Sequence, residues 1–202
     1  MAGCAMDQNI TYYDENASGF HARTKDTDLS SEYDAFVKVL APSRRVLDAG
    51  CGVGRDLVPL MERGCDVSAF DASQEMVALA REAAPTVTVT QMSFQDLDAV
   101  ARYDGIWAQL SLIHVPYEET RAVFEKIHAC LTDGGIFYAT YKYGEASMAS
   151  KGRIFWNMTE VTILPYLEGL FEVISLSVVP DTRSRVSPSD AAKILQVLVK
   201  KL

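Results

Sequence analysis

The chain carries the run Val46-Leu47-Asp48-Ala49-Gly50-Cys51-Gly52-Val53-Gly54-Arg55-Asp56, in which an apolar segment leads to an acidic residue and then to three glycines at alternate positions. The apolar residues predict a short buried strand, and the glycines predict a sharp turn into a helix. Glycine is needed where the backbone adopts a positive φ or lies against a ligand with no Cβ between them. The run therefore predicts a strand, a turn and a helix around a nucleotide-like ligand.

The spacing of these glycines argues against a dinucleotide. A turn that holds pyrophosphate at the start of a helix has the pattern Gly-x-Gly-x-x-Gly. Counted from Gly50, the third glycine of this pattern is replaced by Arg55, and counted from Gly52 it is replaced by Leu57. A different nucleoside ligand is favoured, and a tight connection without any ligand is the alternative.

A second acidic residue, Asp71, ends the run Asp66-Val67-Ser68-Ala69-Phe70-Asp71 and lies 23 residues beyond Asp48. This run predicts a second buried strand. An acidic residue about 20 residues after the glycine turn is positioned to accept hydrogen bonds from ribose hydroxyls. The alternative is that Asp71 caps a helix beginning near Ser73, because Asp is a favourable N-cap residue.

Composition limits the class of protein. With 202 residues and 49% hydrophobic content, the chain fits one domain with a buried sheet. No apolar run approaches the roughly 20 residues of a membrane span, and the N-terminus lacks the pattern of a signal peptide, so a soluble, cytoplasmic protein is expected. The four cysteines show no Cys-x-x-Cys spacing and no clustering with the three histidines, so neither a metal site nor a disulfide framework is predicted.

The net charge of −8 and the scattered basic residues disfavour nucleic acid as a partner. A protein that binds nucleic acid usually carries a basic face that displaces counterions from phosphates. We therefore expect a small-molecule substrate.

Hydrophobic periodicity alternates between helix and strand, which is typical of an α/β fold with a mostly parallel sheet. Helices are predicted at residues 28–40, 55–63, 74–83, 117–131 and 158–169, and strands at 45–47, 67–70, 86–90, 105–109, 136–141 and 171–179. Residues 142–153 form a polar stretch, and residues 181–190 are predicted to be a loop. The last segment, 193–200, is strand or helix by pattern alone.

The acidic and glycine positions from Asp48 to Gly54 resemble motif I of the class I S-adenosylmethionine-dependent methyltransferases. Tyr12-Tyr13-Asp14 and Ser111-Leu112-Ile113-His114-Val115-Pro116 bring the likeness nearest to the tellurite-resistance-type small-molecule enzymes. The resemblance implies a Rossmann-like, seven-stranded mixed sheet of order 3-2-1-4-5-7-6, with strand 7 antiparallel and helices on both faces. It makes 193–200 the last strand.

The resemblance also implies one methyltransferase domain over residues 1–202. Residues 1–40 would form a lid or helical segment over cofactor and substrate, and residues 41–202 the Rossmann-like core. The alternative for the aromatic-rich N-terminal segment is a frayed tail.

The implied cofactor is S-adenosylmethionine, with S-adenosylhomocysteine as product. Asp71 would hold the ribose, Phe94 with either Gln95 or Asp96 would frame the adenine, and Arg23 would reach the carboxylate. The full set of implied cofactor-binding residues is Tyr13, Arg23, Asp48, Ala49, Gly50, Gly52, Arg55, Asp71, Ala72, Met76, Ser93, Phe94, Gln95, Leu110 and Ser111.

His114 is the catalytic candidate. It follows the predicted strand 105–109 at its carboxyl end, where ligands bind in open α/β sheets. A neutral imidazole there can take a proton from a hydroxyl or amine acceptor, and a packed structural histidine is the alternative. The predicted substrate residues are His114, Lys142, Tyr143, Arg153 and Trp156.

Within that set, Lys142 and Arg153 favour an acidic substrate, with solvated surface charge as the alternative reading. Tyr143 and Trp156 would form an aromatic wall. The predicted function is transfer of a methyl group from S-adenosylmethionine to a small molecule. The alternatives are a nicotinamide-dependent oxidoreductase and a non-catalytic S-adenosylmethionine-binding regulator or partner protein.

Overall fold

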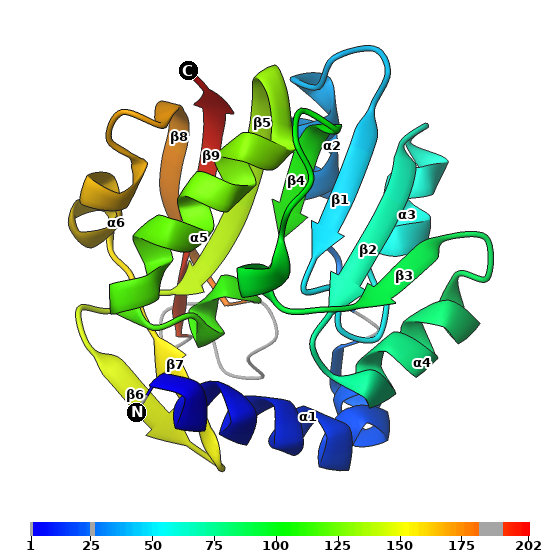
Figure 1. Cartoon of the computed structure of the whole chain (residues 1–202), viewed down its shortest axis with the longest axis vertical. Coiled ribbons are helices and arrows are strands. Elements are labelled where there is room, and N and C mark those ends of the chain that lie inside the picture. Colours follow the sequence, from blue (N-terminus) through cyan, green and yellow to red (C-terminus); the bar gives the residue numbers. More distant parts are fainter. Residues whose placement is uncertain (1, 25–26, 182–191) are drawn as a thin grey trace.

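A computed structural model describes residues 2–24, 27–181 and 192–202. Its centre is a seven-stranded sheet in the order β3-β2-β1-β4-β5-β9-β8 (Figure 1). The strands are β1 Arg45–Ala49, β2 Asp66–Asp71, β3 Thr88–Gln91, β4 Tyr103–Ala108, β5 Leu131–Lys142, β8 Phe171–Pro180 and β9 Lys193–Lys201. The first five run parallel, and β9 pairs antiparallel with both β5 and β8. The predicted strand order and the antiparallel last strand are confirmed.

Helices cover both faces of the sheet (Figure 1). On one face, α2 Ser30–Lys38, α3 Leu57–Glu62 and α4 Gln74–Ala83 share an apolar cluster with β1, β2 and β4. On the other face, α5 Tyr117–Cys130 and α6 Glu160–Leu167 pack against β4, β5 and β9. All residues of β4 are buried, as expected for a strand with helices on both sides.

Strands β1, β2 and β4 end at the same edge of the sheet. β1 pairs with β2 and with β4 in parallel register, so that Asp48 lies opposite Ala69 on one side and Trp107 on the other. The turn after β1 and the residues that follow β2 and β4 therefore meet at the carboxyl edge. Open α/β sheets bind ligands at this edge.

One pair of strands was missed by the sequence analysis. The polar stretch 142–153 contains β6 Ser147–Ser150, which pairs with β7 Arg153–Trp156 in a separate hairpin. Its two turn residues, Lys151 and Gly152, have φ values of 51° and 76°. Positive φ at both positions matches a two-residue turn of type I′. Strands of four residues carry too little alternation to be recognised without their partner.

The N-terminal residues form a long helix, α1 Ala2–Thr24, which runs across the carboxyl edge of the parallel strands and reaches β7 at one end (Figure 1). The following helix, α2, belongs to the apolar cluster against the sheet. Across the described parts of the chain, no helix is both long and apolar enough to cross a membrane. Most of the loop predicted at 181–190 lies outside the described residues.

Candidate functional site

A cavity of about 700 Å³ lies at the carboxyl edge of the sheet, with α1 forming part of its wall. This size is within the range of pockets that hold small molecules and cofactors. One side is formed by the glycine turn, the end of β2 and the segment after β3, and the other by the segment after β4 and by the β6–β7 hairpin. These elements come from almost the whole length of the chain.

The glycines of the turn have different roles. Gly50 has a φ of 75°, and a Cβ placed on it would lie 2.4 Å from the Cβ of Ser111. Only glycine therefore lets Ser111 approach, and the Ser111 hydroxyl donates a 2.6 Å hydrogen bond to the carbonyl of Ala49. A Cβ on Gly54 would instead lie 2.9 Å from the backbone of α4. Gly50 and Gly52 line the cavity, whereas Gly54 allows α4 to pack against the turn.

Asp71 lines the cavity next to this turn. One carboxylate oxygen accepts a 2.8 Å hydrogen bond from the backbone N–H of Gly52, and the other accepts a 2.9 Å bond from that of Ser73. Burial raises the pKa of Asp71, although these backbone donors oppose the shift. The N-cap of α4 is Ser73, whose hydroxyl accepts from the Met76 N–H at 3.1 Å. Helix α4 is therefore capped by Ser73, and Asp71 is not its N-cap residue.

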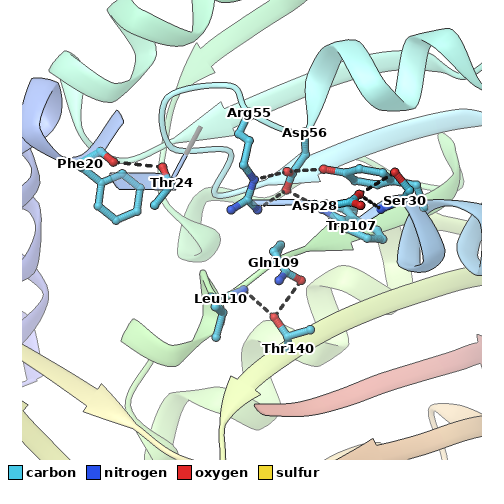
Figure 2. Close-up of polar contacts among 11 residues, drawn as sticks. Phe20, Thr24, Asp28, Ser30, Arg55, Asp56, Trp107, Gln109, Leu110 and Thr140 are labelled. Carbon is cyan, nitrogen blue, oxygen red and sulfur yellow. Dashed lines mark hydrogen bonds and ion pairs between the residues drawn. The ribbon is translucent and has the colours of Figure 1, made fainter. Parts of the chain in front are cut away.

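Arg55 and Asp56 form a buried ion pair behind the turn (Figure 2). Asp56 also accepts hydrogen bonds from the Tyr33 hydroxyl at 2.7 Å and the Trp107 indole at 2.9 Å. Burial alone would raise the pKa of Asp56, but the charge and hydrogen bonds of Arg55 outweigh it and lower that pKa. Arg55 lines the cavity, but its Nε and Nη2 atoms donate to Asp56. Its role in cofactor binding stays a prediction.

Asp48 does not line the cavity. Its side chain is buried, and its Oδ2 atom has no hydrogen-bond partner among the described residues. Burial, followed by the neighbouring charge of Asp56, raises the pKa of Asp48 well above its usual value. The structure thus places Asp48 under the turn, where its protonated form is favoured.

The segment after β3 provides an apolar wall. Phe94 lines the cavity and packs edge-on against Phe70, with ring centroids 5.1 Å apart. Ser93 also lines the cavity and donates from its backbone and hydroxyl to Asp96. Gln95 points elsewhere, because its amide donates a 2.7 Å hydrogen bond to Glu119 of α5. Neither Gln95 nor Asp96 lines the cavity, so the structure does not support the predicted adenine contact from either.

The chain after β4 is held in an unusual backbone conformation. Leu110 has a φ of 52°, which is uncommon for a residue other than glycine. Its N–H donates to the hydroxyl of Thr140 at 2.8 Å, and that hydroxyl donates to the Gln109 side chain at 3.0 Å (Figure 2). Gln109 and Leu110 both line the cavity. Nothing in the sequence pattern indicated that Thr140 would fix this turn.

His114 lies in a short 3₁₀ turn, Leu112–His114, and lines the cavity. Its Nδ1 is 3.0 Å from the carbonyl oxygen of Ile154, and its Nε2 is 2.8 Å from the hydroxyl of Tyr13. A carbonyl can only accept, so Nδ1 carries the proton and Nε2 accepts from Tyr13. Burial, reinforced by the charges of Arg153 and Lys142, lowers the pKa of His114 to about 4. The imidazole is therefore neutral at pH 7.

Helix α1 is fastened to three other elements by side chains. The amide of Asn9 bonds both backbone groups of Ile154 in β7, at 2.9 and 3.1 Å. Tyr13 bonds the 3₁₀ turn through His114, and Asp14 accepts a 2.6 Å hydrogen bond from Ser73 at the start of α4. None of these three polar contacts was anticipated from the sequence. They hold α1 against the cavity.

The β6–β7 hairpin brings positive charge to the cavity. Arg153 and Phe155 alternate with their neighbours along β7 and both line the cavity, as do Lys142 and Tyr143. The Lys142 ammonium lies 3.6 Å from the centroid of the Phe155 ring. Trp156 does not line the cavity, because successive side chains of a strand point to opposite faces. Of the two residues predicted to form an aromatic wall, Tyr143 lines the cavity and Trp156 does not, and Phe155 lies there as well.

Residues 46–135 match the family model described as a methyltransferase domain. The seven-stranded sheet around this match has the Rossmann-like fold of the class I methyltransferases. The family resemblance stated from motif I is confirmed, while the narrower likeness to the tellurite-resistance type stays a prediction.

Three known proteins illustrate the similarity to this methyltransferase domain. The 1,6-didemethyltoxoflavin-N1-methyltransferase of Burkholderia thailandensis, solved with that compound and S-adenosylhomocysteine, has a TM-score of 0.74 and 23% identity over 97% of this chain and 86% of its own. The magnesium protoporphyrin IX methyltransferase of Synechocystis, solved with S-adenosylmethionine, has a TM-score of 0.69 and 22% identity over 97% of both chains. An uncharacterized methyltransferase of Staphylococcus carnosus is 26% identical over 175 residues, which are 81% of this chain and 83% of that protein.

Several other curated relatives match over less than half of their own length. The identities to solved structures bear on the fold, and one fold hosts many activities. What this chain acts on is therefore argued from the site itself.

Most of the predicted site residues come together around the cavity. The structure places there Tyr13, Arg23, Gly50, Gly52, Arg55, Asp71, Ala72, Met76, Ser93, Phe94, Leu110, Ser111, His114, Lys142, Tyr143 and Arg153. Four predicted residues do not line it: Asp48, Ala49, Gln95 and Trp156. Ala49 nevertheless contributes its carbonyl to Ser111. Sequence analysis missed Asn9, Gln109 and Phe155, for which no motif was available.

Proposed function

We propose that this protein transfers a methyl group from S-adenosylmethionine to a small-molecule acceptor bound in the same cavity. The observation that carries the proposal is the continuity of the cavity. It extends from the glycine turn and Asp71 to the Tyr13–His114 pair. A nucleoside cofactor and a second molecule can therefore occupy neighbouring parts of one space.

The residues of the first part fit the proposed cofactor. Asp71 would accept hydrogen bonds from the ribose hydroxyls, since each carboxylate oxygen keeps acceptor capacity beyond its one backbone partner. Phe94 and Met76 would contact the adenine, and Gly50 and Gly52 would let the methionine portion lie against the backbone. The two class I structures solved with S-adenosylmethionine or its product support this cofactor.

When bound, the cofactor supplies a methyl group already activated by a sulfonium. The protein then has to position the acceptor and exclude water. Helix α1 would act as the lid proposed for residues 1–40, because Asn9, Tyr13 and Asp14 fasten it across the cavity. Lids of this kind sequester a reaction from solvent.

Tyr13 and His114 would carry the proton released by the acceptor. The Tyr13 hydroxyl donates to Nε2 of His114 and accepts a long hydrogen bond of 3.4 Å from Nη1 of Arg153, so its oxygen, which lies at the cavity, keeps acceptor capacity. As the acceptor attacks the methyl carbon, its proton would move to the Tyr13 oxygen while the Tyr13 proton moves to His114 Nε2. A histidine with a pKa of about 4 is a weak base, so the proton would leave only as the new bond forms.

Calorimetric titration of the purified protein tests the cofactor part of this proposal. We expect binding of S-adenosylhomocysteine and a loss of about 10- to 100-fold in affinity for Asp71→Ala, because hydrogen bonds to a charged group each contribute about 1.5–3 kcal/mol. The matched control is Asp66→Ala, at the exposed start of the same strand. Preferential binding of NAD, or unchanged affinity in Asp71→Ala, would refute the proposal.

A mass-spectrometric screen tests turnover. Incubation with S-adenosylmethionine and metabolite mixtures should yield an acceptor heavier by one methyl group and S-adenosylhomocysteine in equal amount. A protein that binds the cofactor tightly but leaves every acceptor unchanged would favour the non-catalytic regulator.

A further inference from the structure

Arg153 is held among aromatic rings at the acceptor end of the cavity. Its guanidinium carbon lies 4.3 Å from the centroid of the Tyr12 ring, 4.9 Å from that of Phe155 and 5.7 Å from that of Tyr13. A guanidinium near aromatic faces is stabilised in its charged form. Packing against these rings restricts the motion of the guanidinium.

Arg153 has donors without acceptors, unlike several other arginines of the chain. Arg45, Arg55 and Arg63 each form an ion pair with an aspartate. Within residues 2–24, 27–181 and 192–202, no carboxylate lies within ion-pair distance of Arg153.

The one hydrogen bond of its guanidinium is long, 3.4 Å from Nη1 to the Tyr13 hydroxyl, and its Nε is buried without a partner in the described parts of the protein. Arginine carries five N–H donors, and buried donors are normally satisfied.

The backbone that presents Arg153 is fixed before any ligand arrives. Arg153 is the first residue of β7 and follows the two-residue turn Lys151-Gly152. The next residue, Ile154, has both backbone groups bonded to Asn9 of α1. A donor group held in this way loses little freedom on binding, which favours affinity.

The surroundings of Arg153 favour an anion close to the proposed proton path. Lys142 lies against the same Phe155 ring, so two cations face this end of the cavity. Nη1 of Arg153 is in contact with Tyr13, which in turn bonds His114. The cavity lining also includes the apolar side chains of Ile113, Met148 and Phe155, together with polar residues such as Asn157 and Asp181.

From this geometry we infer that the methyl acceptor is an aromatic carboxylic acid whose carboxylate binds the guanidinium of Arg153. The inference rests on the proposed function, since it names the substrate class of that site. A carboxylate matches the planar fork of arginine and can accept two parallel hydrogen bonds. The apolar lining then receives the ring of the acceptor, and Arg153 directs it toward Tyr13.

Calorimetry with a matched pair of probes tests this inference. The protein, saturated with S-adenosylhomocysteine, is titrated with benzoate and with benzamide, which have similar shape but differ in charge. We expect benzoate to bind at least tenfold more tightly. Equal binding of the two probes, or no binding of benzoate at millimolar concentration, overturns the inference.

Substitutions assign the effect to the side chain. Arg153→Gln should abolish the preference for benzoate, and Arg153→Lys should retain part of it because the charge remains but the fork is lost. Arg102 directly precedes β4 and does not line the cavity. Arg102→Gln makes the same charge change there and should retain the full preference for benzoate. A full preference in Arg153→Gln overturns the inference.

The affinity for S-adenosylhomocysteine separates the two proposals. It should be equal in all four proteins, which also shows that the Arg153 variants are folded. If S-adenosylhomocysteine fails to bind the unmodified protein, the proposed function fails. If it binds normally and only the carboxylate preference is missing, the proposed function stands and the substrate class is wrong.

Discussion

The two ends of the cavity are built in different ways. At the cofactor end, Gly50, Gly52 and Asp71 belong to one strand–helix–strand unit, and backbone groups form most of its contacts. At the acceptor end, Tyr13, His114 and Arg153 come from three distant segments and meet through side chains. The first end depends on local backbone geometry, and the second depends on the completed tertiary structure. The two ends should therefore respond differently to substitution.

The largest effect is expected for Gly50→Ala. A Cβ at this position would lie 2.4 Å from the Cβ of Ser111, and the residue has a φ of 75°. Left-handed backbone costs a residue with a Cβ about 1–2 kcal/mol, and overpacking adds about 1–3 kcal/mol. We expect a loss of about 4 kcal/mol in the free energy of unfolding, measured by urea titration, together with loss of S-adenosylhomocysteine binding.

Gly169→Ala is the matched control for that substitution. Gly169 has a φ of 71°, but no atom lies within 4 Å of a Cβ placed on it. It should show the backbone cost alone and retain cofactor binding. Equal destabilisation in both variants would show that the approach of Ser111 does not matter.

The acceptor end should make stability depend on pH through His114. Its pKa is about 4 in the folded protein, against about 6.5 in an unfolded chain. Between these values the unfolded state binds a proton that the folded state does not, so stability is complete above pH 6.5 and falls as the pH drops toward 4. The expected loss is about 3 kcal/mol.

Urea unfolding of the unmodified protein and of His114→Gln, at pH 7 and at pH 4.5, measures this difference. The variant should lose less stability between the two values, because carboxylates that titrate in this range are common to both proteins. Parallel pH profiles would show that His114 is not the buried neutral base described above.

Much of the first end and little of the second could be predicted from sequence. The strand order was implied by the family resemblance, and the glycine turn and helix 74–83 follow from local patterns of apolar residues, glycine and capping residues. The β6–β7 hairpin was missed, because a pair of four-residue strands is stabilised by Asn9 and Tyr12, more than 100 positions away. Trp156 and Gln95 were misplaced for a related reason, since the face of a short strand or turn is set by its tertiary partners.

Removal of the Tyr13–His114 pair should lower turnover without affecting the cofactor end. General acid–base groups contribute about 100-fold or more to rate. We expect Tyr13→Phe and His114→Gln each to reduce kcat by about 100-fold, with S-adenosylhomocysteine affinity changed less than about threefold, once an acceptor is identified. The double variant should be no slower than the slower single variant, because both residues would act on one proton. Additive losses would indicate that the two side chains act independently.

The smallest effect is expected for Gln95→Ala, which tests how far the cofactor end can be inferred from sequence position alone. The Gln95 amide is bonded to Glu119 at 2.7 Å and does not line the cavity, whereas the preceding Phe94 does. S-adenosylhomocysteine affinity should therefore change less than about twofold in Gln95→Ala and about tenfold or more in Phe94→Ala, because burial of an aromatic side chain against a ligand contributes roughly 1.5–3 kcal/mol. A large loss in Gln95→Ala would mean that the residue leaves Glu119 to bind adenine, and the cofactor end would then depend on a side-chain rearrangement as well as on its backbone.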